Sequence, residues 1–106
     1  MPKFIVIYPY PTDVDAFETA YTNEHIPLAM EKIKGMSKFV ASRIVATPDG
    51  SRPPFYRIAE LHFPSMDALQ ETAASPGLQE AAAHAVSIST GGPPHFLVAE
   101  EETTEF

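Results

Sequence analysis

Tyr21 and His25 are the two side chains of this sequence best suited to chemistry. They stand four residues apart in a helical pattern, and residues at that spacing lie one above the other, so the phenol and the imidazole can reach one ligand. An imidazole titrates close to neutral pH and can exchange a proton with a carbonyl, enol or lactone. We predict that His25 transfers a proton and that Tyr21 orients the substrate or His25. The alternatives are a histidine that caps a broken helix and a tyrosine that belongs to the core.

The helix that carries this pair contains a proline. Asp13 is typical of a residue that caps a helix start, and Gly35 of one that follows a helix end, which predicts a helix between them. Pro27 cannot donate a backbone hydrogen bond and crowds the preceding turn, so we expect the helix to kink or restart near His25. That interruption would leave polar backbone beside the imidazole.

The remaining pattern predicts four strands and a second helical region. The strands are expected at Lys3–Tyr8, Lys38–Ala46, Tyr56–Phe63 and His95–Glu100. Ser65 caps a helix from Met66 to about Ala74, and Ser75-Pro76 restarts it toward Ile88. The order βαββαβ predicts an α+β, ferredoxin-like fold with a four-stranded antiparallel sheet and two helical regions on one face. Residues 1–106 form a single domain in this scheme, with 101–106 as a short acidic tail.

The second face of such a sheet needs a cover. It would expose a large apolar patch, for which we expect the residues Phe4, Val6, Tyr8, Ile58 and Phe96 or Leu97. A homodimer that joins two such faces would bury the patch and enclose a shared cavity. Because a chain of this length has room for one core but not for a large internal site, we expect a useful cavity to need the second subunit.

Four further residues are candidates for substrate binding. Glu60 and His62 share a strand face with Tyr56 and Ile58, so they could hold a polar substrate group if that face lines the dimer cavity. The alternative is a polar contact across the dimer. Tyr8 ends the first strand, where it could line the pocket mouth or pack against the first helix.

Composition excludes several classes of function. Seven basic and fourteen acidic residues give a net charge of −7, which disfavours nucleic acid and anionic membranes as partners. The chain has no cysteine, and its four histidines lack the paired spacing of metal sites, so we expect neither a metal nor a cofactor. No phosphate loop or nucleophile elbow is present. Without a signal-peptide pattern or a membrane-length apolar run, a cytoplasmic location is the expectation. His84 and His95 receive no role.

The motif around His25 resembles the EthD-like family of the dimeric α/β barrel superfamily, small proteins named for their association with ethyl tert-butyl ether breakdown. The specific part is Tyr21, His25, Pro27 and Leu28, followed by Gly35. Looser agreement extends the likeness over nearly the whole chain and comes from Ala59, Leu61, Phe63, Ser75-Pro76 and Gly91-Gly92.

The resemblance implies a pair of ferredoxin-like subunits around a barrel-like interior, often with an apolar pocket that opens near the histidine of each subunit. Similar barrels include cofactor-free monooxygenases, lactone isomerases, polyketide cyclases and decarboxylases. Relatives often carry an acidic residue where His84 stands, so an acid–histidine partnership across the helices is not carried over. We therefore predict cofactor-independent proton-transfer chemistry on a small apolar carbonyl, lactone or aromatic compound, in a degradation pathway. The alternatives are a non-catalytic ligand-binding or stress-related dimer, and a structural module without a pocket.

Overall fold

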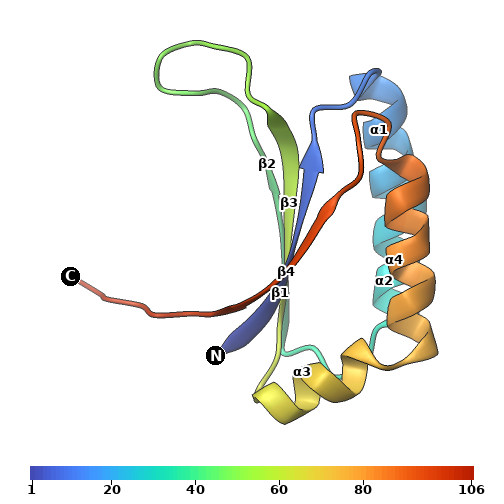
Figure 1. Cartoon of the computed structure of the whole chain (residues 1–106), viewed down its shortest axis with the longest axis vertical. Helices are drawn as coiled ribbons and strands as arrows, with labels where there is room; N and C mark the ends of the chain where they lie inside the picture. The colour runs from blue at the N-terminus through green and yellow to red at the C-terminus, as the bar shows by residue number, and fades with distance from the viewer.

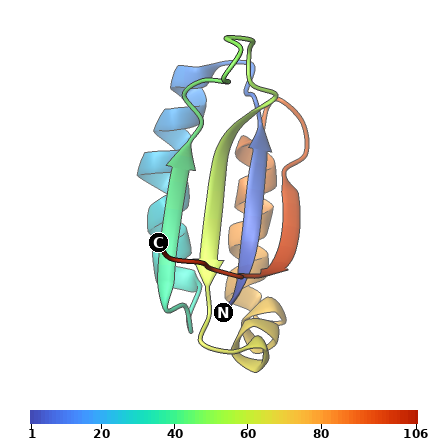
Figure 2. The same ribbon diagram turned by 90° about the vertical axis from the view of Figure 1, so that its left-hand side faces the viewer.

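Four antiparallel strands form one sheet in the order β2-β3-β1-β4 in the computed structural model, which describes residues 1–106. The strands are β1 (Pro2–Pro9), β2 (Lys38–Arg43), β3 (Phe55–His62) and β4 (His95–Glu100). All helices lie against one face of the sheet, and no element covers the other (Figure 1). Figure 2 shows this open face toward the viewer, with the helices behind it.

The helices begin where short polar side chains cap them. They are α1 (Val14–Ala20), the π-helical turn η1 (Tyr21–His25), α2 (Ile26–Lys32), α3 (Met66–Ala73) and α4 (Pro76–Ile88). Asp13, Ser65 and Ser75 each accept a hydrogen bond from a backbone N–H three residues on, which satisfies donors that a helix start leaves free. The predicted ferredoxin-like βαββαβ fold is confirmed, including two helical regions that are each made of two pieces.

The interruption of the first helical region is a π-helical turn rather than a break. Across it, the N–H of Ile26 bonds to the carbonyl of Tyr21, five residues back, instead of four as in an α-helix. Pro27 follows at once and has no N–H to donate. The wider turn accommodates the proline, so the chain continues as α2, and it places the pair Tyr21 and His25 inside the irregular turn.

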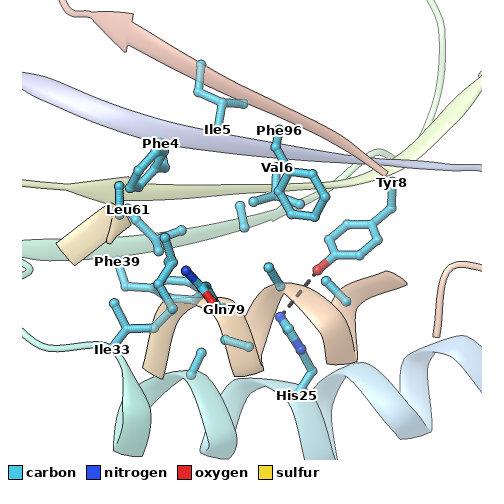
Figure 3. A pocket seen from close by; sticks show the side chains of 17 residues that line it. Phe4, Ile5, Val6, Tyr8, His25, Ile33, Phe39, Leu61, Gln79 and Phe96 are labelled. Carbon is cyan, nitrogen blue, oxygen red and sulfur yellow. Dashed lines mark hydrogen bonds between the residues drawn. The ribbon is translucent and has the colours of Figure 1, made fainter. Parts of the chain in front are cut away.

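The predicted orientation of β1 is wrong. Phe4, Val6 and Tyr8 line a cavity on the helix side of the sheet, whereas the side chains of Lys3, Ile5 and Ile7 alternate with them and face the open side. Ile5 also borders the cavity, but its side chain points away from it (Figure 3). Val6 is paired with Ala59 and Phe96, so Phe96 also belongs to the helix side, and Ile58 and Leu97 to the open side. Because β1 is an almost uninterrupted apolar run, its sequence does not show which of its residues face the helices.

Tyr56 also lies on a different face from the predicted one. Its ring contacts that of Phe17 on the helix side, with ring centres 5.8 Å apart. The register between β1 and β3 shifts after Tyr8, which pairs with Arg57, while Pro9 pairs with Phe55. This irregularity leaves one residue unpaired and breaks the alternation that would otherwise put Tyr56 beside Ile58 and Glu60.

A close approach fixes α4 against α2. A Cβ atom on Gly77, in the first turn of α4, would collide with the carbonyl of Lys32 at the end of α2. Only glycine lets the two backbones meet there. The contact fixes the position of α4 along its axis relative to η1, and therefore which residues of α4 can reach His25.

The open face carries apolar side chains beside a charged cluster of Lys3, Glu60, His62 and Glu101. Leu97 is 49% exposed there, and Ile5, Ile7 and Ile58 are partly exposed. Residues 101–106 form no helix or strand and extend away from the sheet on this side (Figure 1). None of the helices is both long and apolar enough to cross a membrane.

Candidate active site

A cavity of about 350 Å³ lies between the sheet and the helices of a single chain. Fifteen of its seventeen lining residues are hydrophobic, and the other two are His25 and Gln79. Figure 3 shows Phe4, Val6 and Phe96 reaching into it from the sheet, His25 at one end, and Gln79 nearer the end lined by Ile33 and Phe39. The expectation that a useful cavity needs a second subunit was therefore wrong, because the two layers of one chain already form a cavity of this size.

Small side chains create the space. The helices contribute alanines where larger residues would fill the gap between the layers, namely Ala29, Ala73, Ala81, Ala82 and Ala85. The sheet adds Ala59 opposite them. The run of alanines in α4 was the sequence signal for this cavity, since a helix face of alanine leaves room above it that leucine would occupy.

His25 is the polar group at the inner end of the cavity. Its side chain is 8% exposed, and its Nε2 atom lies 3.3 Å from the hydroxyl of Tyr8 (Figure 3). The ring of Tyr21 stacks on the imidazole, with ring centres 5.6 Å apart and planes 23° apart. The predicted pair therefore does lie together, but Tyr8 is the tyrosine whose hydroxyl meets His25.

Burial keeps both partners of this hydrogen bond uncharged. Burial, together with a smaller contribution from the neighbouring His84, lowers the pKa of His25 to about 4. Burial also raises the pKa of Tyr8 well above its usual range, so the phenol keeps its proton. At neutral pH the site presents a neutral imidazole and an intact hydroxyl at the end of an apolar chamber.

His84 is the neighbour that the sequence did not assign. The Nδ1 atoms of His25 and His84 are 2.9 Å apart, and the two rings meet edge to edge with nearly parallel planes, 7° apart. The Nε2 atom of His84 lies 3.7 Å from the carboxylate of Glu24. These histidines are 59 residues apart in sequence, so only the packing of α4 on η1 could reveal the contact.

Tyr21 packs beneath His25 and does not line the cavity. Its hydroxyl is buried without a hydrogen-bond partner, and burial raises its pKa to about 12. The guanidinium of Arg57 lies over its ring, 4.8 Å from the ring centre. Arg57 in turn forms a two-pronged ion pair with Glu18, with N–O distances of 3.1 and 2.8 Å. The Glu18–Arg57 ion pair therefore packs against the Tyr21 ring, and the Tyr21 ring packs against the imidazole of His25.

The other predicted binding residues lie outside the cavity. Glu60 and His62 face the open side, where Glu60 bonds to Lys3 at 2.6 Å and His62 lies 3.7 Å from both Glu60 and Glu101. Tyr56 belongs to the aromatic cluster around Phe17. No three histidine, aspartate or glutamate side chains converge to hold a metal ion.

The fold and the site together define a ferredoxin-like domain with an internal apolar pocket that ends at a histidine. Residues 9–87 match the model of the EthD domain, and the chain belongs to the EthD family. It is 33% identical over 103 residues to an 11.0 kDa protein from the thcB–thcC intergenic region of Rhodococcus erythropolis, with 97% of each chain covered.

Solved structures agree with this family and fold. An ethyl tert-butyl ether (EthD) family protein from Bacillus halodurans has a TM-score of 0.87 and 29% identity, with 96% of this chain and 99% of that chain covered. A dimeric ferredoxin-like protein from Jannaschia sp. CCS1 has a TM-score of 0.64 at 15% identity, covering 95% and 100%. SnoaB, a cofactor-independent oxygenase from Streptomyces nogalater, has a TM-score of 0.66 at 16% identity, covering 97% and 94%.

Proposed function

We propose that this protein is a cofactor-independent enzyme that moves a proton on a small, apolar carbonyl compound, with His25 as the base. The observation that carries the proposal is the position of the neutral His25 Nε2, 3.3 Å from the Tyr8 hydroxyl and at the end of a cavity that is otherwise almost wholly apolar. An apolar chamber with a few converging polar groups is the usual form of a small-molecule site.

In the proposed reaction, the carbonyl oxygen of the substrate accepts a hydrogen bond from the Tyr8 hydroxyl. The Nε2 atom of His25 removes a proton from the adjacent carbon, and the electron pair of the C–H bond passes into an enolate. Return of the proton to carbon or oxygen gives an isomer or an enol and regenerates the neutral imidazole. Tyr21 holds the imidazole ring in place by stacking, so its orienting role does not depend on its hydroxyl.

The size of the cavity restricts the substrate class. About 350 Å³ lies at the lower end of the range for ligand pockets, which suits a compound of one or two rings or a short branched chain. The aromatic rings of Phe4, Phe39 and Phe96 favour a flat apolar body. Gln79 could meet a second polar group at the far end (Figure 3).

A second copy of the chain is the proposed cover of the open sheet face. The exposed Leu97 and its partly exposed isoleucine neighbours make an apolar surface that a face-to-face homodimer would bury. Glu60 and His62 lie on this face, so their proposed contact with a ligand or a partner requires the dimer. Sedimentation analysis at micromolar concentration should give twice the 11.6 kDa chain mass.

The enzymatic proposal can be tested with 2-tetralone, a bicyclic apolar ketone whose C1 protons are flanked by the ketone and the aromatic ring. Proton NMR in D₂O should show saturable, protein-catalysed exchange of these protons, and His25→Ala should lower the rate at least about 100-fold. The rate should stay high down to acidic pH and fall only near the His25 pKa of about 4.

Equal exchange by wild type and His25→Ala would remove His25 from the chemistry. Stoichiometric binding of 2-tetralone without exchange would favour the non-catalytic, ligand-binding alternative. Failure of 2-tetralone to bind at millimolar concentration would contradict the substrate class.

A further inference from the structure

Four side chains, two of them histidines, form a chain of contacts from the cavity to solvent. Tyr8 meets Nε2 of His25, the two Nδ1 atoms of His25 and His84 are 2.9 Å apart, and Nε2 of His84 lies 3.7 Å from the Glu24 carboxylate. Glu24 is 63% exposed at the outer end. The chain of contacts runs from β1 through η1 to α4 and back to η1.

The short contact between the two Nδ1 atoms restricts the protons on both rings. Two lone pairs would repel at 2.9 Å, and two N–H groups would clash, so one ring must donate and the other must accept. In a neutral imidazole the other nitrogen then has the opposite role. The proton on this one contact therefore decides whether His25 presents a lone pair or an N–H to the cavity.

The negative charge of Glu24 favours one of the two arrangements. At 3.7 Å, beyond direct hydrogen-bond length, the ionised carboxylate attracts a proton on Nε2 of His84 through its charge. The Nδ1 atom of a neutral His84 is then an acceptor, and Nδ1 of His25 must donate to it. As a result, Nε2 of His25 carries the lone pair and can accept the proton of the Tyr8 hydroxyl in the resting site.

We propose that His84, oriented by Glu24, is a positioning residue that holds His25 in the tautomer whose Nε2 is free to act as a base. The inference rests on the proposed function for its catalytic meaning, because a base needs a lone pair that faces the substrate. Carboxylates that orient a histidine through its second nitrogen have the same physical effect in other sites. Here a second imidazole lies between the carboxylate and the histidine.

The tautomer can be measured without any substrate. In protein labelled with ¹⁵N-histidine, long-range proton–nitrogen spectra distinguish protonated from unprotonated ring nitrogens, and His25→Gln identifies the His25 signals. At pH 7 we expect a proton on Nδ1 and none on Nε2 of His25. A proton on Nε2 of His25 in the wild-type protein would overturn the proposal.

Two substitutions at position 84 distinguish a role of His84 as a hydrogen-bond acceptor from a role in packing alone. In His84→Asp a carboxylate oxygen can take the place of Nδ1 and still accept, so the His25 tautomer should persist and 2-tetralone exchange should stay within about threefold of wild type. In His84→Leu the acceptor is lost, and kcat should fall at least about tenfold with little change in KM. An unchanged tautomer and rate in His84→Leu would contradict the role of His84.

Glu24→Gln tests the outer end with little risk to folding, because the side chain is exposed. A neutral amide can donate to Nε2 of His84 as well as accept from it, so the preference for a proton on that atom weakens and part of the His25 proton population should move to Nε2. Glu31→Gln, an exposed change on α2, is the matched control and should leave the spectra unchanged. Identical spectra for the two variants would remove Glu24 from the proposal.

The two proposals fail in different ways. If His25→Ala exchanges 2-tetralone as fast as wild type, the enzymatic proposal fails while the ring spectra still report the tautomer. If His25→Ala is inactive but His84→Leu retains both tautomer and kcat, only the positioning role fails.

Discussion

The two faces of the sheet treat their histidines differently. His25 and His62 are similarly buried, with 8% and 5% of their surfaces exposed. His62 lies on the open face between Glu60 and Glu101. Both of these carboxylates also pair with Lys3. His25 meets two tyrosines and a second histidine, but no carboxylate. Burial among uncharged partners leaves an imidazole available for chemistry, whereas a charged network uses its polar groups internally.

The pH dependence of stability should show the largest effect of this difference. The pKa of His25 falls from 6.5 to about 4 on folding, so the unfolded chain binds more protons between these values. The free energy of unfolding should therefore decrease as the pH falls from about 7 to 4, by up to about 3 kcal/mol from this residue.

Urea titrations of wild type and His25→Gln across this pH range measure the effect. The variant should lose this part of the pH dependence, and His95→Gln, an exposed change on β4, should retain it. Parallel curves for wild type and His25→Gln would mean that His25 is not buried neutral.

Filling the cavity should have the next largest effect. Ala82 lines the chamber, so Ala82→Leu should occupy part of it and weaken 2-tetralone binding at least about tenfold, which is about 1.4 kcal/mol. Ala83 is the neighbouring exposed residue of α4, and Ala83→Leu serves as the matched control. Isothermal titration calorimetry gives both affinities, and equal values would place the ligand elsewhere.

Removal of the unpaired hydroxyl should have a smaller effect, of opposite sign to most core changes. Tyr21→Phe eliminates a buried group that lacks a hydrogen bond, so it should raise the free energy of unfolding by about 1 kcal/mol. Tyr8→Phe instead removes a hydroxyl that bonds to His25 and should slow exchange. Thermal unfolding and the exchange assay separate the two tyrosines, and a destabilised Tyr21→Phe would reveal a partner for that hydroxyl.

A charge change on the open face should have the smallest effect. Lys3→Met breaks the contact with Glu60 but leaves the cavity untouched, so it should alter the free energy of unfolding by under about 1 kcal/mol. The exchange rate should not change. A large loss of activity would show that the open face does contribute to the chemistry.

The fold could be predicted because its determinants are local. Asp13, Ser65 and Ser75 act as caps wherever they precede a helical pattern, and their positions set the helix starts. Pro27 showed that the helix must change there, but the same signal fits a kink, a break or a wider turn. The choice of a π-helical turn depends on packing around His25 and Tyr21.

The site was only partly predictable, because its contacts join distant segments. Tyr21 and His25 were found from their spacing. Which side chains of β1 face the helices depends on its pairing with β3, so the contact of Tyr8 with His25 could not be predicted from the sequence. His84 lies in an alanine-rich helix with no local pattern that points to His25. Its contact with His25 depends on the position of α4 along its axis, and the close approach of Gly77 to α2 sets that position.

The π-helical turn also determines how this helix can vary in length. It contains one residue more than a regular turn, and the N–H of Ile26 bonds across it to the carbonyl of Tyr21. Deletion of Asn23 would keep these two groups as partners but make them four residues apart, so α1 and α2 would join as an ordinary α-helix with little rotation of one half against the other. Phe17 would therefore stay in the aromatic cluster, and the change would be confined to the turn that stacks Tyr21 on His25. A one-residue difference in length at this turn would thus alter the surroundings of the imidazole without disturbing the packing of the flanking helices.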